Sequence, residues 1–351
     1  MRGDSLAKQQ RRCRSWNVCV IGALLVFIVS CGEQDGAVAP ENQHEQSAKA
    51  SIPDFSGVWS NASLTRLTRA EEVDSLVLDP ALAQRLTDSN FHNVRAAKAG
   101  EQSDPDRGAP EKLDRLPPVG NYSANWVDPG ARYGVVNGEI RSSWIIDPAD
   151  GQMPFSATAQ EAFAQRRTLR SAMSGPEVLS PGERCLIGFG GSGGPPMLNV
   201  LYNNFYRIVQ TPTHLMILVE MVHDARIIPI GGSEPVAGDL RWLGNSSAEF
   251  DGDTLVITTS QFHRARATSG PVPLSEDAVV IERLRRSSPD SLYYAFEISD
   301  PQLYTQTVRG EMTFQRSDQR VFEYACHEGN YAMGSMLRGA RLQETETASK
   351  P

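Results

Sequence analysis

The chain has 351 residues, of which 34 are basic and 42 acidic, so its formal net charge is −8. An acidic chain without a basic cluster is a poor candidate for binding nucleic acid or an anionic lipid surface. Its length suffices for one large β-rich domain or two small ones with an ample core.

The first 30 residues have the pattern of an export signal. A positive segment that contains Lys8, Arg11 and Arg14 precedes an apolar run over 18–29. This run has the length of a signal-peptide core and is shorter than the ~20 residues that span a bilayer. We therefore expect residues 1–30 to be a signal peptide. Their removal takes away five basic residues and one acidic residue, which makes the net charge −12.

The end of the apolar run, Ile28-Val29-Ser30-Cys31-Gly32, resembles a bacterial lipobox. The resemblance implies a lipoprotein whose cysteine, Cys31, carries acyl chains such as palmitate that hold the protein to a membrane. Because Gly32 and not aspartate follows the cysteine, similarity to sorting in Gram-negative bacteria favours the outer membrane over the inner one. An ordinary signal peptide or a short membrane anchor is the alternative.

Three further segments follow from the pattern of polar and apolar residues. Residues 31–52 are small and polar without a period, so we expect a disordered tether. Residues 53–340 are predicted to form a single β-rich domain, and residues 341–351 a disordered tail.

The first half of the domain mixes strand and helix patterns. The sequence predicts a strand over 55–59, helices over 63–77 and 79–88, a loop over 99–119 and a strand over 141–146. A turn follows at 147–151. A capping box from Thr158 to Glu161 then predicts a helix that ends near Met173.

Strand patterns separated by turns dominate the second half. They cover 204–210, 214–230, 254–262, 278–286, 292–299, 304–316 and 321–326. Asp251-Gly252-Asp253 is predicted to be a hairpin turn, because the later ligands of a calcium loop are missing. Strands at this spacing without helices between them form antiparallel sheet. The predicted fold is mainly β, an antiparallel barrel or sandwich with a few helices in the N-terminal half.

A glycine-rich segment at 188–196 contains the spacing of both a dinucleotide fingerprint and a nucleophile elbow. Both motifs require a helix to begin at once. Here Pro195-Pro196 and a strand-like stretch follow instead, so we expect a flexible loop.

Two cysteines remain after the signal peptide is removed and Cys31 is lipidated. They are Cys185 and Cys326. In an oxidising periplasm such a pair indicates one disulfide. Two separate buried thiols are the alternative, because sequence spacing does not show that the geometry closes.

Two histidines are the candidate site residues. His223 lies within an apolar strand pattern, and period-two alternation places it on the face of Ile217 and Met221, opposite Glu220 and Asp224. A satisfied core histidine is the alternative there. His327 and Glu328 directly follow Cys326, where a disulfide would clamp the turn beside the 187–196 loop. A purely structural turn is the alternative at that position.

Several segments resemble an uncharacterised family of secreted bacterial proteins. They include YNNFYRIVQTPTHLMILVEMVHDARIIPI (202–230), with its EMVHDAR motif, and YACHEGNYAM (324–333), with its YACHEGNY motif. The resemblance extends from about Asp54 to Ala340, and it implies no established activity. The glycine-rich segment at 187–194 departs from the family's pattern.

Two functional hypotheses follow. In the first, the exported lipoprotein has a β-rich domain that binds a small, largely apolar ligand or an envelope partner. In the second, it is an enzyme in which His223, His327, Glu328 and Asp224 share a pocket and perform acid–base chemistry of the hydrolase or lyase type. Two histidines and a carboxylate could also hold a metal, although no His-Glu-x-x-His spacing supports this. The sequence indicates no particular cofactor.

Overall fold

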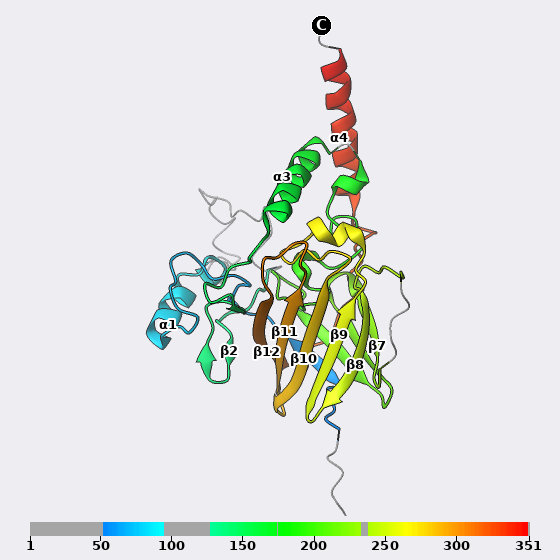
Figure 1. Cartoon of the computed structure of the whole chain (residues 1–351). Helices are drawn as coiled ribbons and strands as arrows, with labels where there is room; N and C mark the ends of the chain where they lie inside the picture. The colour runs from blue at the N-terminus through cyan, green and yellow to red at the C-terminus, as the bar shows by residue number, and fades with distance from the viewer. Residues whose placement is uncertain (1–51, 95–126, 174, 233–237, 350–351) are drawn as a thin grey trace, which may run out of the picture. The chain divides into compact units, whose positions relative to one another are not determined.

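A computed structural model describes residues 52–94, 127–173, 175–232 and 238–349 (Figure 1). All of these residues belong to one unit, Ser51–Pro351. The predicted signal peptide, Cys31, nearly all of the predicted tether and the predicted loop over 99–119 lie outside the described residues.

An antiparallel sheet forms the body of the domain, and its strands follow one another in the order β7-β6-β5-β1-β12-β11-β10-β9-β8, with β4 paired to β12. The strands are β1 (Gly57–Ser60), β4 (Ile145–Asp147), β5 (Phe205–Gln210), β6 (His214–Val219), β7 (Ala225–Pro229), β8 (Asn245–Asp251), β9 (Thr254–Ser260), β10 (Val279–Ser288), β11 (Ser291–Ser299) and β12 (Val308–Arg316). A separate small hairpin consists of β2 (Val135–Val136) and β3 (Glu139–Ile140). The predicted mainly β, antiparallel fold is confirmed.

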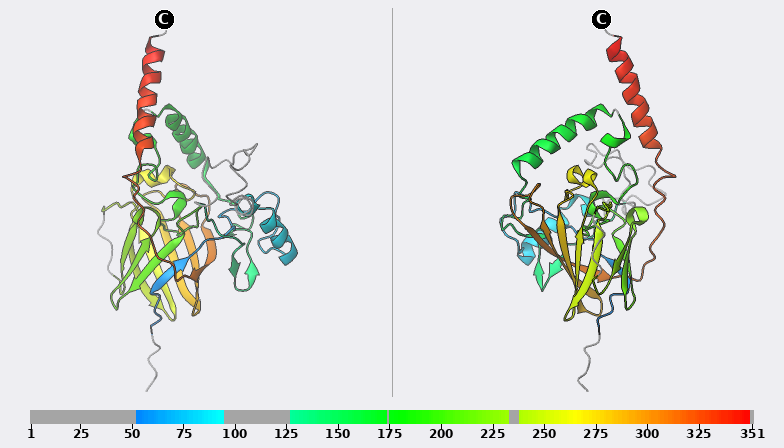
Figure 2. Two further views of the ribbon diagram at one scale, coloured as in Figure 1. Left: turned by 180° about the vertical axis from the view of Figure 1, so that it is seen from behind. Right: turned by 45° about the vertical axis from the view of Figure 1, so that its right-hand side comes forward.

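The two ends of this sheet approach each other, so the sheet is nearly a closed barrel (Figure 2). Directly after β7, Ile230 forms a parallel bridge with Ala248 of β8. The Gly231 amide donates to the Ala248 carbonyl at 2.9 Å. This bridge and hydrogen bond connect the two edge strands at one point, and covering an edge in this way reduces its capacity to pair with other chains.

Alternation of side chains explains why the long strands form and which face they bury. In β11 the residues Leu292, Tyr294, Phe296 and Ile298 are buried, whereas the residues between them are only half-buried. Period-two burial is the property of a strand with one face against a core. The buried faces of the strands therefore fill the inside of the barrel.

The helices lie outside the sheet and begin at capping residues where the sequence supplies them. Helix α1 (Pro80–Asp88) is capped by Asp79, whose carboxylate accepts from two amides of the first turn. Helix α3 (Ala157–Ala172) begins after Ser156, so its start is two residues earlier than the capping box at Thr158 predicts. The helices predicted over 79–88 and from Thr158 to Met173 are thus present, with small shifts at their ends.

Two predicted elements of the N-terminal and central parts are wrong. Residues 63–77 are not helical, because Thr65 donates its hydroxyl to the Arg141 carbonyl and Arg66 bridges to Ser143. Hydroxyl side chains that bond to distant backbone compete with helix formation. Residues 214–230 are not one strand but a hairpin, in which β6 and β7 pair with each other.

The C-terminal part also differs from the prediction. Residues 321–326 form no strand, and the chain continues into helix α4 (Tyr331–Ala348), so the helices are not confined to the N-terminal half. This helix includes most of the tail that was expected to be disordered. It buries only Ala340 and is rich in residues of high helix propensity, so its local composition and not an apolar face explains it. Within the described part of the chain, no helix has the length and apolar character to cross a membrane.

Candidate functional site

A cavity of about 1150 Å³ lies between the end of β1, the start of β5 and the C-terminal segment 322–336. Aromatic side chains form much of its wall: Phe189, Tyr202, Phe205, Phe322 and Tyr324. Carboxyl and amide groups make up much of its polar lining: Asp128, Glu183, Glu220, Glu323, Asn203, Asn204 and Asn330. The volume is slightly above the roughly 300–1,000 Å³ of common small-molecule pockets.

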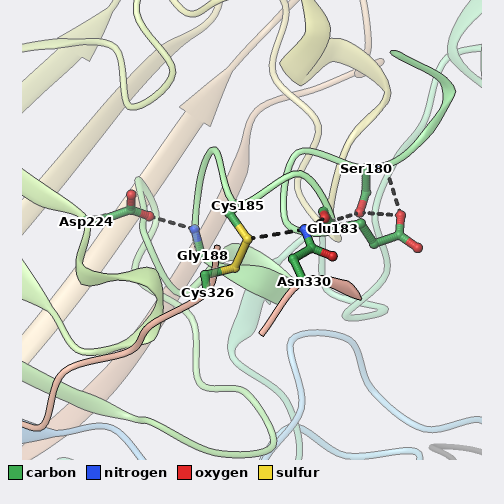
Figure 3. The surroundings of a disulfide bond; sticks show 7 residues. All are labelled: Ser180, Glu183, Cys185, Gly188, Asp224, Cys326 and Asn330. Atoms are coloured by element: carbon green, nitrogen blue, oxygen red, sulfur yellow. Dashed lines mark hydrogen bonds between the residues drawn. A yellow bond between two sulfur atoms is a disulfide. The ribbon is translucent and has the colours of Figure 1, made fainter. Parts of the chain in front are cut away.

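A disulfide between Cys185 and Cys326 fixes one wall of the cavity (Figure 3). The predicted pairing is confirmed, and the alternative of two separate thiols is excluded. The side-chain amide of Asn330 donates to the Glu183 carbonyl at 2.8 Å and to the Cys185 sulfur at 3.5 Å. The C-terminal segment is therefore held to the 183–185 turn by one covalent link and two hydrogen bonds.

The EMVHDAR segment is a tight, strained turn between β6 and β7. Val222 has φ 60° and ψ 14°, and His223 has φ 47°. A left-handed conformation is unusual for any residue except glycine and is an outlier for a β-branched one. Met221 and Val222 are nevertheless buried in the core, which holds the turn in place. Across this turn, Glu220 is buried at the cavity wall and His223 is exposed.

Glu220 forms part of the cavity wall and is only 3% exposed. Its Oε1 accepts from the Phe322 amide at 3.2 Å, which attaches the C-terminal segment to the turn. Its Oε2 is buried and accepts no hydrogen bond from any described residue. Burial raises the pKa of Glu220, although Asn203 and the backbone partly oppose this. A buried carboxyl oxygen without a donor costs free energy, so its presence here requires an explanation.

Glu183 has a different environment at the opposite wall. Arg170 of α3 binds it through two hydrogen bonds of 2.5 Å, and Ser180 donates both its amide and its hydroxyl at 2.8 Å. Burial raises the pKa of Glu183, but these donors outweigh burial and the net shift is downward. This carboxylate is ionised and already satisfied, so it has a structural role.

The predicted site residues do not meet in this cavity. His223, His327 and Glu328 are exposed, and none of them is part of the cavity wall. The expectation that His223 faces apolar surface is wrong, because strand alternation holds only in an unbroken strand and the turn at Val222 interrupts it. His327 and Glu328 lie in the turn after Cys326 with their side chains in solvent.

Asp224 occupies a separate, largely buried position. Its Oδ2 accepts from the Gly188 amide at 2.6 Å, at the start of the glycine-rich segment (Figure 3). Burial raises the pKa of Asp224 to about 6, while the Gly188 amide, His223 and Arg266 lower it. Within the described ranges, no three His, Cys, Asp or Glu side chains are arranged to hold a metal ion.

The second half of the glycine-rich segment is buried, whereas Gly190 is exposed and Phe189 and Gly191 are half-buried. Residues 192–198 are buried, with the Tyr206 hydroxyl donating to the Ser192 carbonyl and the Met197 amide donating to the Tyr294 hydroxyl, both at 2.9 Å. The segment forms no helix longer than the 3-10 turn Phe189–Gly191. The prediction of a loop is confirmed, but the expectation of flexibility does not match this buried environment. Ser192 is fully buried, which is unsuitable for a nucleophile elbow.

Sequence reasoning missed the residues that do line the cavity. Glu220 lay in a segment of interest, but alternation assigned it to the polar face of a strand. Tyr202, Asn203 and Tyr324 belong to the segments that carry the family resemblance, yet nothing in their local pattern distinguishes them from core or turn residues. An acidic residue inside an otherwise apolar segment was the one feature that could have identified Glu220.

Comparison with known proteins does not assign this chain to a family. No family model matches the chain, and no curated protein gives a significant match to it.

Proposed function

We propose that this protein is an exported lipoprotein whose β domain binds a small, largely apolar molecule. The observation that carries the proposal is the cavity of about 1150 Å³ with aromatic side chains such as Phe205 and Tyr324 on its wall. Small-molecule sites combine an apolar wall with a few convergent polar groups that orient the ligand. The Cys185–Cys326 disulfide supports the proposal, because it holds the wall in place before a ligand arrives.

The inside of the barrel is a poor alternative location for a ligand. Arg226 and Glu282 form an ion pair there, the Tyr294 hydroxyl donates to Glu282, and Met197 of the glycine-rich segment is fully buried beside them. Side chains therefore occupy the space that a larger barrel would offer to a ligand. The histidine-based enzyme hypothesis receives no support from the geometry, because His223 and His327 lie outside the cavity.

Binding of a neutral apolar fluorophore tests the cavity. We expect the full mature chain to bind N-phenyl-1-naphthylamine saturably, at one site. Ala332→Trp, which places an indole in the cavity wall, is expected to weaken binding at least tenfold. Ala348→Trp is the matched control, because Ala348 is exposed on the same helix and does not line the cavity. Equal binding by both variants would contradict the proposed location.

The membrane anchor is a separate part of the proposal, and it rests on the lipobox resemblance. We expect cells that express Cys31→Ser to incorporate no labelled palmitate into the protein, because the thioether requires that sulfur. Cys19→Ser is the control and keeps the label, since Cys19 lies within the signal peptide. Density fractionation of the labelled membranes then tests the outer-membrane assignment. Label that persists in Cys31→Ser would refute the anchor.

A further inference from the structure

The charged groups of the cavity wall all have one sign. Asp128, Glu183, Glu220 and Glu323 contribute carboxyl groups, and no lysine, arginine or histidine among the described residues lines the cavity. Arg170, which does not line the cavity, forms an ion pair with Glu183 alone among these four carboxyl groups. A cavity with one sign of charge and low-dielectric walls concentrates ligands of the opposite sign.

The aromatic wall suits the same kind of ligand. Tyr202, Phe205, Phe322 and Tyr324 line the same cavity as the carboxyl groups, and Phe322 is 66% exposed. The face of an aromatic ring attracts a cation, with an interaction worth ~0.5–2 kcal/mol per contact in general. An aromatic wall with carboxyl groups is therefore complementary to an apolar cation, whereas an anion would meet repulsion.

Glu220 is the carboxyl group in this wall with one buried oxygen that has no hydrogen-bond partner in the described part of the chain. Burial raises its pKa, although the Phe322 and Phe205 backbone and the Asn203 side chain lower it. Its Oε1 is engaged by the Phe322 amide, its Oε2 accepts nothing among the described residues, and the side chain is almost fully buried. The other carboxyl groups differ from it: Glu183 is saturated by Arg170 and Ser180, and Glu323 is exposed to solvent. A buried carboxyl oxygen without a donor is expected in a group that binds a ligand, because the ligand supplies the donor.

We infer that the cavity recognises an organic amine, with the Glu220 carboxylate accepting a hydrogen bond from the ligand's ammonium group and the aromatic wall enclosing its apolar part. This inference rests on the proposed function, and it names the class of ligand. An ammonium beside Glu220 supplies both the missing donor and the missing counter-charge.

A pH dependence follows from this assignment. Glu220 must be ionised to accept the ammonium, and burial raises its pKa, so amine affinity increases as pH rises through that pKa. The other titratable groups that face the cavity are Asp128, Glu183, Glu323, Tyr202 and Tyr324. A neutral ligand of the same shape needs no ionised carboxylate, so its affinity is not expected to rise in the same way.

Three indole compounds that differ in one group provide the test: tryptamine (cationic), tryptophol (neutral) and indole-3-acetate (anionic). Calorimetric titration uses the full mature chain carrying Cys31→Ser, between pH 4.5 and 8. We expect tryptamine to bind at least tenfold more tightly than tryptophol at pH 8, and indole-3-acetate to bind most weakly. The advantage of tryptamine over tryptophol should shrink as the pH is lowered.

Variants separate recognition from folding. Glu220→Gln keeps an oxygen for the Phe322 amide, and we expect it to remove the tryptamine preference while tryptophol affinity changes less than threefold. Glu328→Gln, an exposed carboxylate of the same C-terminal segment that does not line the cavity, is expected to change either affinity less than threefold. Equal binding of tryptamine and tryptophol, or an unchanged preference in Glu220→Gln, would overturn the amine inference.

The outcomes also distinguish the two proposals. If the neutral fluorophore binds and tryptamine shows no preference or no binding, the amine inference fails and the binding cavity stands. If neither the fluorophore nor any of the indoles binds, both proposals fail. Should Glu220→Gln unfold, the pH profile of the unsubstituted site decides, because a tryptamine preference that is independent of pH contradicts the role of Glu220.

Discussion

Arg226 and Glu282 form a buried ion pair between two strands, β7 and β10, that are not neighbours in the sheet. The Nη1–Oε1 distance is 3.0 Å and the Nη2–Oε2 distance is 2.5 Å, with side chains 2% and 0% exposed. The Tyr294 hydroxyl also donates to Glu282 at 2.8 Å, and Arg226 reaches Thr259 at 3.2 Å. The pair lies inside the barrel near the point where β7 and β8 approach each other. It therefore connects β7 to β10 across the core.

Glu282→Gln is expected to destabilise the protein by about 3–5 kcal/mol, because it leaves the Arg226 charge buried and uncompensated. Urea unfolding measures the loss. Glu297→Gln is the control: it removes an ion pair between Arg309 and Glu297, whose side chains are 46% and 28% exposed, and such an exposed pair contributes little to stability. Similar losses in both variants would show that the buried pair has no special role.

Removal of the disulfide is expected to lower stability by about 4–5 kcal/mol, since the link closes a loop across 141 positions of sequence. Cys185→Ser, Cys326→Ser and the double variant should lose the same amount, because either single change breaks the same bond. Denaturation in urea without reductant measures this. Additive losses in the double variant would indicate that the sulfurs contribute separately.

Asp224 makes stability depend on pH in a defined direction. Its pKa is about 6 in the folded protein and near 3.8 when unfolded, so the folded protein binds more protons and stability falls as pH rises from about 4 to 6. The fall is at most about 3 kcal/mol. Asp224→Asn retains an acceptor for the Gly188 amide, and we expect it to be more stable than wild type at pH 7.5 and similar at pH 4.

Urea unfolding at several pH values measures this effect. The exposed carboxylate variant Asp318→Asn is the control and should keep the wild-type profile. A lower stability of Asp224→Asn at pH 7.5 would mean that the ionised Asp224 carboxylate, for example through its attraction to Arg266, stabilises the fold.

The strained turn makes His223 sensitive to backbone preference and not to side-chain chemistry. With φ at 47°, His223→Val is expected to cost about 1–2 kcal/mol, whereas His223→Gly should leave stability unchanged or raise it. His327 has an exposed side chain and no positive φ, so His327→Val should change stability by less than about 0.5 kcal/mol. Melting temperatures of the three variants provide the comparison. A loss in His223→Gly as large as that in His223→Val would show that the side chain and not the backbone matters.

Local patterns in the sequence determined much of the fold. The strands over 254–262, 278–286 and 292–299 were predicted within a few residues of β9, β10 and β11, because period-two alternation is a property of each strand alone. Asp251-Gly252 forms the predicted turn, in which Asp251 pairs with Thr254 and Gly252 has φ 60°. The disulfide was predicted by counting cysteines, on the expectation of export to an oxidising compartment, and the Cys185–Cys326 bond is present.

Only the tertiary structure decided where the cavity lies and which residues line it. Core packing holds Val222 in a conformation that its own side chain disfavours, and this turn sends Glu220 to the cavity wall and His223 to solvent. The hydrogen bond from Phe322 to Glu220 joins residues 102 positions apart, and the disulfide joins residues 141 apart. A pattern read along the chain reports the preferences of neighbouring residues, whereas a cavity depends on segments that meet only when the whole core is packed.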